Sequence, residues 1–363
     1  EYVYISDGKP HVLSPKFTYY GYRYAKVTGV HHLTLDSFVG VAYYSDVRPV
    51  STMVTGDEKL NQLLSNIRWG QKSNFVDVPT DCPQRDERMG WTGDTQVFAA
   101  TACYLTDACA FYEKYLYDMQ KEQNKRGGCV PDTIPAFYMR GGCCVWGDAA
   151  TILPWTLYLF YGDVNILRTA LPSMRAWVDY IAAVDGDTHH WREVFHFGDW
   201  LALDHPSGRA DEVRGGTDEG FIADAYYYHS TRLVAKAAAV LGDNETAAAY
   251  QKRAEKILSD LQQEYFTPTG RCAVDTQTAQ ILALYFGLTD YPERAHRELM
   301  RLLHLRGDKL STGFVGTPLL CRVLSQVGED KMAYHLLHNE EYPGWLYEVN
   351  LGATTIWERW NSL

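Results

Sequence analysis

The chain has 363 residues and a formal net charge of −11 at pH 7, and it contains 26 tyrosines and 10 tryptophans. This length suits one large domain plus a fragment, or two domains, and easily buries a sizeable core. The acidic balance without a Lys/Arg block argues against nucleic-acid or anionic-membrane partners, and no apolar stretch reaches the roughly 18 residues of a membrane span.

The first 50 residues predict β-strands. The stretches KFTYYGYRYAKVTG and LTLDSFVGVAYYSDV alternate β-branched and aromatic residues with polar ones and are broken by glycine. The period becomes helical near residue 52, where Leu60, Leu63, Leu64 and Ile67 form one stripe after a Gly-Asp start. We therefore expect residues 1–50 to belong to a different domain from residues 51–363.

Helical patterns then recur with short Gly, Pro or Asp punctuation. Because short loops force consecutive helices to be neighbours, we expect antiparallel pairs arranged as a toroid of helical hairpins. No period of about 34 or 40 residues repeats, which disfavours a solenoid. The predicted helices span residues 95–106, 107–123, 147–161, 163–184, 220–241, 243–265, 274–286, 291–304, 315–327, 328–338 and 354 onward.

Two connections are longer than the others, NKRGGCVPDTIPAFYMRGGC and DHPSGRADEVRGGTDEG. Long loops on a compact helical body are either mobile or border an active site. Both connections are therefore candidates for the wall of a cleft.

Cysteine and histidine patterns give no indication of a metal site. The eight cysteines contain no C-x-x-C pair, which predicts buried free thiols and slightly favours a reducing compartment. The histidines at 189, 190, 196 and 205 lack metal-ligand spacing and are expected to be solvated loop residues. No metal and no cofactor are expected, and the compartment, cytoplasmic or periplasmic and secreted, stays open.

The segment DCPQRDERMGWTGD, residues 81–94, combines acidic, basic and aromatic side chains. Prolines at 79 and 83 keep the chain out of a helix until about residue 92. A solvated loop of mixed charge is one interpretation. The other is a loop that holds several acids in fixed places, because Gly90 and Gly93 would let a ligand approach Trp91 closely and Asp94 stands where a helix N-cap would direct it back toward the loop.

A second cluster, YPGWLYEVNLGATTIWERW, ends the chain. It places Glu348 on a predicted extended segment and Glu358 in a predicted helix that begins near Gly352. Aromatic residues at helical spacing usually form core, but a carboxylate between two tryptophans is costly unless it is used or paired. The segments VWGDAAT, with Trp146, and GDWLALD, with Asp199 and Trp200, fit helix caps and ligand contacts equally well.

Six motifs together resemble the catalytic domain of the bacterial α-L-rhamnosidases, glycoside hydrolase family 78, over about residues 50–363. The resemblance implies an (α/α)6 barrel of six inner and six outer helices, preceded by the end of a β-sandwich in residues 1–50. It also implies inverting hydrolysis of terminal α-L-rhamnose. The motifs are VPTDCPQRDERMGWTGDTQVFAATACY, VWGDAAT, GDWLALD, DTQTAQILALYFGL, GFVGTPLL and YPGWLYEVNLGATTIWERW.

The resemblance also implies roles for single residues. Glu87 matches the general acid of the family and Glu358 best matches its general base. The remaining expected substrate contacts are hydroxyl-binding and pocket-lining residues, namely Asp81, Arg85, Trp91, Asp94, Trp146, Asp199, Trp200 and Glu348. An inverting enzyme needs a protonated acid and an ionised base about 6.5–9.5 Å apart, so Glu87 requires a raised pKa, which neighbouring carboxylates favour and neighbouring arginines oppose.

Family members continue beyond the last motif with an Asn-His-Tyr segment and a C-terminal β-sandwich, so a catalytic domain that ends at Leu363 is expected to be truncated. Two other functions stay open: a sugar-binding module without catalysis, and a related helical-toroid glycosidase for another sugar, such as a uronic acid. The aglycone, the linkage and the oligomeric state are not readable from the sequence.

Overall fold

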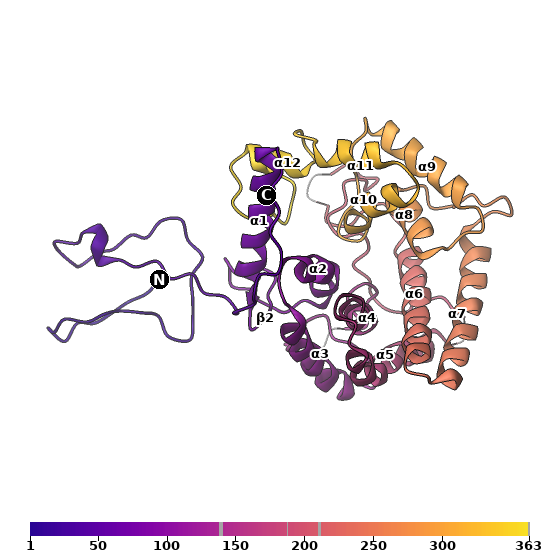
Figure 1. Cartoon of the computed structure of the whole chain (residues 1–363), viewed down its shortest axis with the longest axis horizontal. Helices are drawn as coiled ribbons and strands as arrows, with labels where there is room; N and C mark the ends of the chain where they lie inside the picture. The colour runs from indigo at the N-terminus through magenta and orange to yellow at the C-terminus, as the bar shows by residue number, and fades with distance from the viewer. Residues whose placement is uncertain (138–140, 187, 210–211, 362–363) are drawn as a thin grey trace.

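A computed structural model of the chain describes residues 1–137, 141–186, 188–209 and 212–361, and its helices form a ring (Figure 1). The predicted mainly α (α/α)6 barrel is confirmed. The inner helices of the ring are α2 (Thr92–Leu105), α4 (Ala149–Tyr161), α6 (Glu219–Val240), α8 (Gln277–Phe286), α10 (Thr317–Gln326) and α12 (Trp345–Asn350). The outer helices are α1 (Glu58–Asn74), α3 (Cys109–Asn124), α5 (Val164–Asp185), α7 (Asn244–Tyr265), α9 (Pro292–Leu305) and α11 (Asp330–Leu337).

Side-chain patterns explain which helices lie inside. Helix α6 buries residues around its whole circumference, from Phe221 to Ala238, as an inner helix must. Helix α7 buries only the stripe of Tyr250, Ala254, Ile257, Leu261 and Tyr265 and turns charged residues outward. The two helices pack along their lengths as one hairpin.

Short glycine and aspartate signals set the helix ends. Gly162 and Gly287 end α4 and α8 in the left-handed conformation, which glycine adopts without steric cost. Asp218 and Asp243 cap α6 and α7 by accepting hydrogen bonds from backbone N–H groups of the first turn. These tight connections keep consecutive helices antiparallel and adjacent.

The ring closes where its last helix meets its first. Helix α12 packs against α1, and both lie beside the C-terminus in Figure 1. Ten of the predicted helices from residue 95 to residue 338 are found with ends within three residues of their expected positions. The prediction of a helix from residue 354 onward is wrong, because the final helical turn is Trp345–Asn350 and the chain then runs irregularly.

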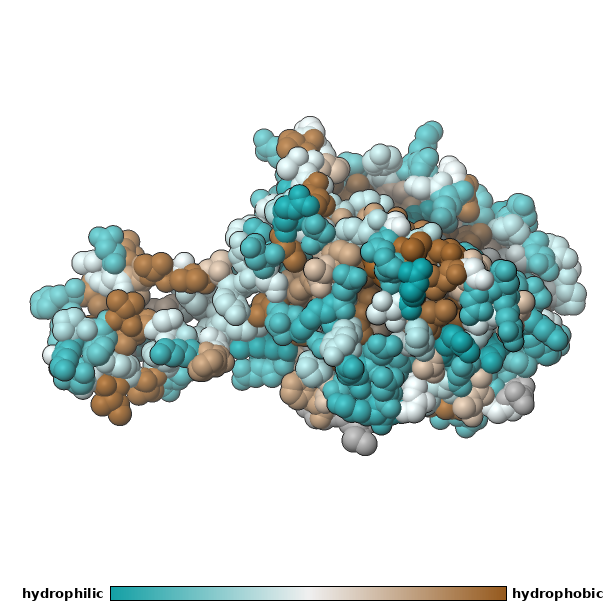
Figure 2. All heavy atoms as spheres, turned by 60° about the horizontal axis from the view of Figure 1, so that its bottom comes forward, coloured by the Kyte–Doolittle hydropathy of each residue, from teal (hydrophilic) through white to brown (hydrophobic). Residues whose placement is uncertain are grey.

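The first 50 residues differ from the prediction. They contain a single 3-10 turn, Leu35–Ser37, and none of the expected strands, and none of their side chains is buried. Figure 2 shows apolar side chains exposed across this lobe. Strands of a sandwich need paired neighbours and a second sheet to cover their apolar faces, and this segment supplies neither. Within the described ranges, the strands are Phe75–Val76 (β1) and Val78–Pro79 (β2).

Every helix in the described ranges is too short or too polar to span a bilayer. All eight cysteines are free, and five of them are buried, which confirms the prediction of buried free thiols for those five.

Candidate functional site

The loop of residues 81–89 is closed at its base. The Asp81 N–H donates to the Met89 carbonyl at 2.9 Å, and the Met89 N–H donates to Asp81 Oδ1 at 2.8 Å. Asn74, at the end of α1, anchors the base by donating from Nδ2 to the carbonyls of Thr80 and Asp81. Asp81 therefore shapes the loop that carries Arg85 and Glu87.

Arg85 joins the two predicted catalytic carboxylates. Its Nη2 lies 3.1 Å from Glu87 Oε2 and 3.5 Å from Glu358 Oε2. The two carboxylate oxygens therefore lie no farther apart than the sum of these distances. Glu87 and Glu358 come from opposite ends of the barrel sequence and meet at one place.

A cleft of about 450 Å³ lies beside this trio and is lined by Arg85, Asp86, Glu87, Met89 and Trp91. Within it, the indole Nε1 of Trp91 donates to Glu87 Oε1 at 3.2 Å. One oxygen of Glu87 thus faces the indole and the other faces the Arg85 guanidinium.

The pKa values of two acids of the loop, Asp81 and Glu87, are shifted in opposite directions. Burial raises the pKa of Asp81. Burial also favours a higher pKa for Glu87, but hydrogen bonds from Asp81, Arg85 and Trp91 outweigh it and hold the pKa of Glu87 below its ordinary value. The pKa of Asp81 is therefore shifted upward and that of Glu87 downward, and the opposing influence of the arginine prevails at Glu87.

Asp94 lies in the first turn of α2 and is the third residue of that helix, so its prediction as the N-cap is wrong; the N-cap is Trp91. Burial, followed by the negative charge of Asp81, raises the pKa of Asp94 to about 7, and the charges of Glu358 and Glu87 act in the same direction. Because these charges act on its pKa, Asp94 belongs to the same cluster of acids as Asp81, Glu87 and Glu358.

Three potential ligand atoms of the loop, from Asp81, Cys82 and Glu87, lie within 4.8 Å of one another. Burial raises the pKa of the Cys82 thiol, and a protonated thiol is a poor metal ligand. The Arg85 guanidinium already supplies positive charge to Glu87. The chemistry of this group fits a protonated thiol and an Arg85–Glu87 ion pair better than a metal ion.

An aromatic cluster stands behind Trp91. Phe197 packs edge-on against Trp91 at 5.9 Å and against Trp200 at 5.8 Å between ring centroids. Trp146 tilts against Phe197 at 4.4 Å and stacks on Phe314 at 5.1 Å. Because Trp146 is only 4% exposed, it supports the wall from behind, whereas Trp91 and Trp200 are partly exposed.

The glycines beside Trp91 make room for the protein itself. A Cβ at Gly90 would lie 2.2 Å from the Ile134 carbonyl oxygen, and one at Gly93 would lie 2.7 Å from the Trp146 ring. The expectation that these glycines let a ligand approach Trp91 is therefore wrong: they let other parts of the protein pack closely. Residues 131–134 of the first long connection lie against the start of α2.

Asp199 is fully buried and occupied by protein donors. It accepts hydrogen bonds from Thr278 Oγ1 at 2.5 Å and from the backbone N–H groups of Gly313, Val315 and Gly316. Burial raises the pKa of Asp199 to about 6. The expected direct sugar contact is not compatible with this position; Asp199 instead fixes the 313–316 loop, which carries Phe314.

The sequence predicted an extended segment for Glu348 and a helix for Glu358, and the structure shows a helix for Glu348 and an irregular segment for Glu358. Glu348 lies on α12, not on an extended segment, is 1% exposed and accepts a hydrogen bond from the Trp357 N–H at 3.0 Å. Burial raises the pKa of Glu348 to about 7. Glu358 lies on an irregular segment, not in a helix, and its side chain is 55% exposed. Glu348 thus holds the segment that presents Glu358.

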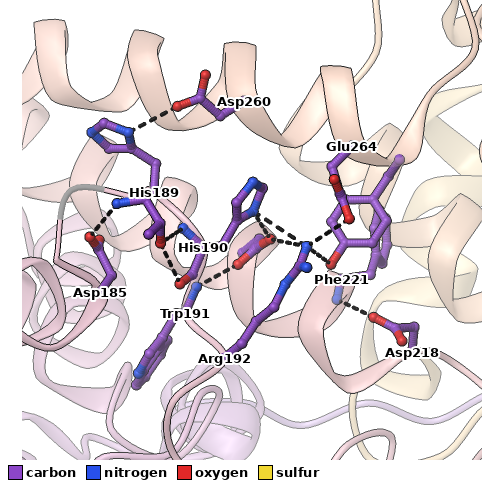
Figure 3. A network of polar contacts seen from close by, with 12 residues as sticks. Asp185, His189, His190, Trp191, Arg192, Asp218, Phe221, Asp260 and Glu264 are labelled. Carbon is purple, nitrogen blue, oxygen red and sulfur yellow. Dashed lines mark hydrogen bonds and ion pairs between the residues drawn. The ribbon is translucent and has the colours of Figure 1, made fainter.

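Some of the histidines that were predicted to be solvated instead bond to other groups of the protein. His190 Nδ1 lies 2.7 Å from the buried carboxylate of Asp224, and Arg192 bonds Glu264 and the Tyr265 hydroxyl (Figure 3). This network fastens the 189–192 loop to α6 and α7. His196 is buried, with its ring nitrogens bonded to the Cys144 N–H and the Trp191 carbonyl, so its prediction as a solvated residue is wrong.

The second long connection lines a different cavity of about 540 Å³, together with Tyr265 and residues 273–276. This cavity is larger than the cleft at Glu87 but contains neither predicted catalytic glutamate. We place the functional site at the smaller cleft because Arg85, Glu87 and Trp91 line it and Glu358 bonds Arg85 at its edge.

Sequence reasoning missed three contributors to the site. Met89 lines the cleft, and Phe197 and Phe314 complete the aromatic cluster. Both phenylalanines lie next to a glycine in or beside a quoted motif, in FHFGDW and GFVGTPLL. This position was the feature of the sequence that could have indicated them as part of the site.

The comparisons with known proteins agree with this geometry. A family model described as the bacterial alpha-L-rhamnosidase 6 hairpin glycosidase domain matches residues 48–363. A second, described as the bacterial alpha-L-rhamnosidase concanavalin-like domain, matches residues 1–44. An alpha-L-rhamnosidase of Formosa agariphila is 40% identical over 358 residues, which cover 96% of this chain and 38% of the relative. An alpha-L-rhamnosidase of Streptomyces avermitilis is 40% identical over 354 residues, which cover 96% of this chain and 33% of the relative.

Solved structures give the same result. The alpha-L-rhamnosidase of Streptomyces avermitilis complexed with L-rhamnose matches with a TM-score of 0.81 at 39% identity, over 88% of this chain and 30% of that one. The native enzyme of Aspergillus terreus matches with a TM-score of 0.83 at 35% identity, over 88% and 37%. The chain thus spans less than two fifths of the length of these relatives. By its family model over residues 48–363 and its relatives at 40% identity, the chain belongs to the bacterial alpha-L-rhamnosidase family of six-hairpin glycosidase domains.

Proposed function

We propose that this chain is the catalytic part of an inverting α-L-rhamnosidase, which releases terminal α-L-rhamnose from plant glycosides or rhamnose-containing polysaccharides. Residues 51–363 form the catalytic domain and residues 1–50 the end of a β-sandwich. The observation that carries the proposal is the convergence of Glu87 and Glu358 on Arg85 at the edge of one cleft. The solved relative with bound L-rhamnose supports the choice of sugar.

In the proposed reaction, Glu87 protonates the departing glycosidic oxygen while Glu358 takes a proton from the attacking water. Because both oxygens bond the same nitrogen of Arg85, their separation in the free protein lies at or below the lower limit of the range of about 6.5–9.5 Å that inverting enzymes use. The proposal of inversion therefore rests on the family and not on this distance. Oxygen–carbon bond formation by water and cleavage of the glycosidic bond then invert the anomeric configuration.

The proton that Glu87 needs is close at hand. Asp81 has a raised pKa and a hydrogen bond to Glu87, so a proton can pass along this bond from one carboxyl group to the other. We propose that sugar hydroxyls take over the Arg85 donors on binding, because arginine binds hydroxyl and carboxylate oxygens alike. The loss of the hydrogen bonds from Arg85 to Glu87 and the burial of the site by the sugar would both raise the pKa of Glu87.

The remaining predicted residues have supporting or contacting roles in this proposal. Trp91 and Trp200 offer flat apolar faces to the ring and to the C6 methyl group of rhamnose, and Asp94 accepts from the sugar hydroxyls. Trp146, Asp199 and Glu348 act indirectly, since they are buried beneath the wall or the segment that they hold.

The test is the anomeric configuration of the first product, followed by NMR during hydrolysis of an aryl α-L-rhamnoside. Release of β-L-rhamnose as the first product is expected. Initial release of the α-anomer would overturn the inverting mechanism, and hydrolysis of an aryl uronide in preference to the rhamnoside would overturn the substrate. A chain that binds rhamnose without hydrolysis would be a sugar-binding module instead.

A further inference from the structure

The exposed N-terminal segment touches the loop that carries Glu87. Arg88, the residue after Glu87, lays its guanidinium over the Tyr19 ring at 4.1 Å from the ring centroid. Its Nη2 also donates to the Tyr19 backbone carbonyl at 2.8 Å. One residue of the first 50 therefore makes two separate contacts with the neighbour of the proposed general acid.

Arg88 occupies a backbone conformation that needs support. Its φ of 55° lies in the left-handed region, which side chains other than glycine adopt at a cost in free energy. The side chain offsets this cost by donating from Nε to the Pro83 carbonyl at 3.2 Å and from Nη2 to Tyr19. Because the turn at Arg88 follows Glu87 directly, it determines the direction in which the Glu87 side chain leaves the loop.

A second contact lies two residues further along the segment. A Cβ built on Gly21 would come within 2.7 Å of Gln84 Cα, so the two backbones touch and no larger side chain fits between them. Gln84 precedes Arg85 in the same loop. The N-terminal segment thus touches the catalytic loop at Gln84 and at Arg88, on either side of Arg85 and Glu87.

The contact is local. Tyr22 and Tyr24 of the same segment are 66% and 91% exposed, whereas Tyr19 is half-buried and burial raises its pKa. All of the other residues among the first 44 are exposed. The segment therefore meets the loop through a small and specific surface.

We propose that Tyr19 and Gly21 are positioning residues of the general acid: the domain that precedes the barrel fixes the 84–88 turn and so holds Glu87 against the cleft. This inference rests on the proposed role of Glu87. It extends the catalytic machinery beyond the six-hairpin domain, to residues that touch neither the sugar nor the reacting atoms.

The test compares two substrates in two variants of the chain. Tyr19→Ala removes the stacked ring, and Gly21→Val forces the two backbones apart. Since a misplaced acid matters most when the leaving group needs a proton, we expect kcat to fall about tenfold or more on a rhamnosyl disaccharide. On a dinitrophenyl rhamnoside, whose leaving group needs no proton, the change should be less than about threefold. KM should change little in both variants.

Controls separate positioning from a general loss of structure. Tyr19→Phe keeps the ring and should restore the disaccharide rate, and Tyr24→Ala, at an exposed ring of the same segment, should act like the unchanged chain. Equal losses on both substrates, or no loss in either variant, would overturn the inference. Glu87→Gln is measured in parallel: if it shows no difference between the substrates, the proposed function fails, and if it alone shows the difference, only the positioning role fails.

Discussion

The carboxylates of Glu87 and Glu358 share one cation. Arg85 bonds both through Nη2, at 3.1 Å and 3.5 Å, although a barrel's length of sequence separates the two glutamates. The arginine keeps two like charges together in the free protein, and in the proposed reaction the sugar and the attacking water bind beside it.

Replacement of this cation should shift the pH dependence of the reaction. Arg85 lowers the pKa of Glu87, so Arg85→Met raises that pKa and the general acid keeps its proton to a higher pH. We expect the alkaline limb of kcat/KM to move to higher pH and kcat/KM to fall by about tenfold or more, because the sugar loses its arginine contact. The measurement is a pH–rate profile of both proteins.

Arg48→Met is the matched control for this profile, since Arg48 is an exposed arginine that also pairs with a carboxylate, that of Asp107, away from the cleft. It should leave the profile unchanged. An alkaline limb that stays in place or moves to lower pH in Arg85→Met would contradict the assigned influence of Arg85.

Removal of the proposed base should abolish turnover. In Glu358→Ala the proposed base is gone and Glu87, the other carboxylate beside Arg85, is needed as the acid, so we expect a loss of about 10³-fold or more. Added azide should restore a reaction whose product, a rhamnosyl azide, has the inverted configuration, which NMR can establish. If azide rescues Glu348→Ala while Glu358→Ala keeps full activity, the two glutamates have been assigned in the wrong order.

Glu348 should govern stability, not catalysis. Burial raises its pKa from 4.5 to about 7, so its contribution to stability is fully present below pH 4.5 and is lost as the pH rises through 7. As the pH rises from 5 to 8, the unchanged chain should therefore lose roughly 2–3 kcal/mol of unfolding free energy relative to Glu348→Gln, which cannot titrate. Urea unfolding at the two pH values measures this loss, and a constant difference between the proteins would show that Glu348 does not titrate in this range.

Asp199 should act on the aromatic wall through the 313–316 loop. Asp199→Ala leaves the Thr278 hydroxyl and three backbone N–H groups without their acceptor, and each buried unpaired donor costs about 1–3 kcal/mol. We expect the free energy of unfolding to fall by about 3 kcal/mol or more in urea titrations. Asp275→Ala, which removes an exposed surface pair with Arg301, should cost less than about 1 kcal/mol; equal effects would deny Asp199 its structural role.

The helices were predictable because each one carries its own signals. Asp243 caps α7 and Gly162 ends α4, and both can be read without knowledge of the tertiary structure. The final helix was missed because Trp345–Asn350 is too short to show a period. The first 50 residues have the alternation of strands and match the concanavalin-like family model over residues 1–44. The expected strands are not found, and no second layer in the described part of the chain covers the apolar side chains of this segment.

The site was predictable in its residue types and less so in its environments. The motifs located Glu87, Arg85 and Glu358, but burial depends on the distant residues that the fold brings together. Asp199 and Glu348 looked like ligand contacts because they stand beside tryptophans, and both are buried behind them. The direction of the pKa shift at Glu87 also depended on geometry, since the placement of Asp81, Arg85 and Trp91 around its carboxylate decides it.

Because α12 packs against α1, the ring can close only after the whole chain has been synthesised. A nascent polypeptide presents Glu87 early, within the first hairpin, but Glu358 joins it only after all six hairpins have emerged and the last has docked onto the first. In the proposed reaction, an unfinished translation product would therefore hold the proton donor without the group that activates water.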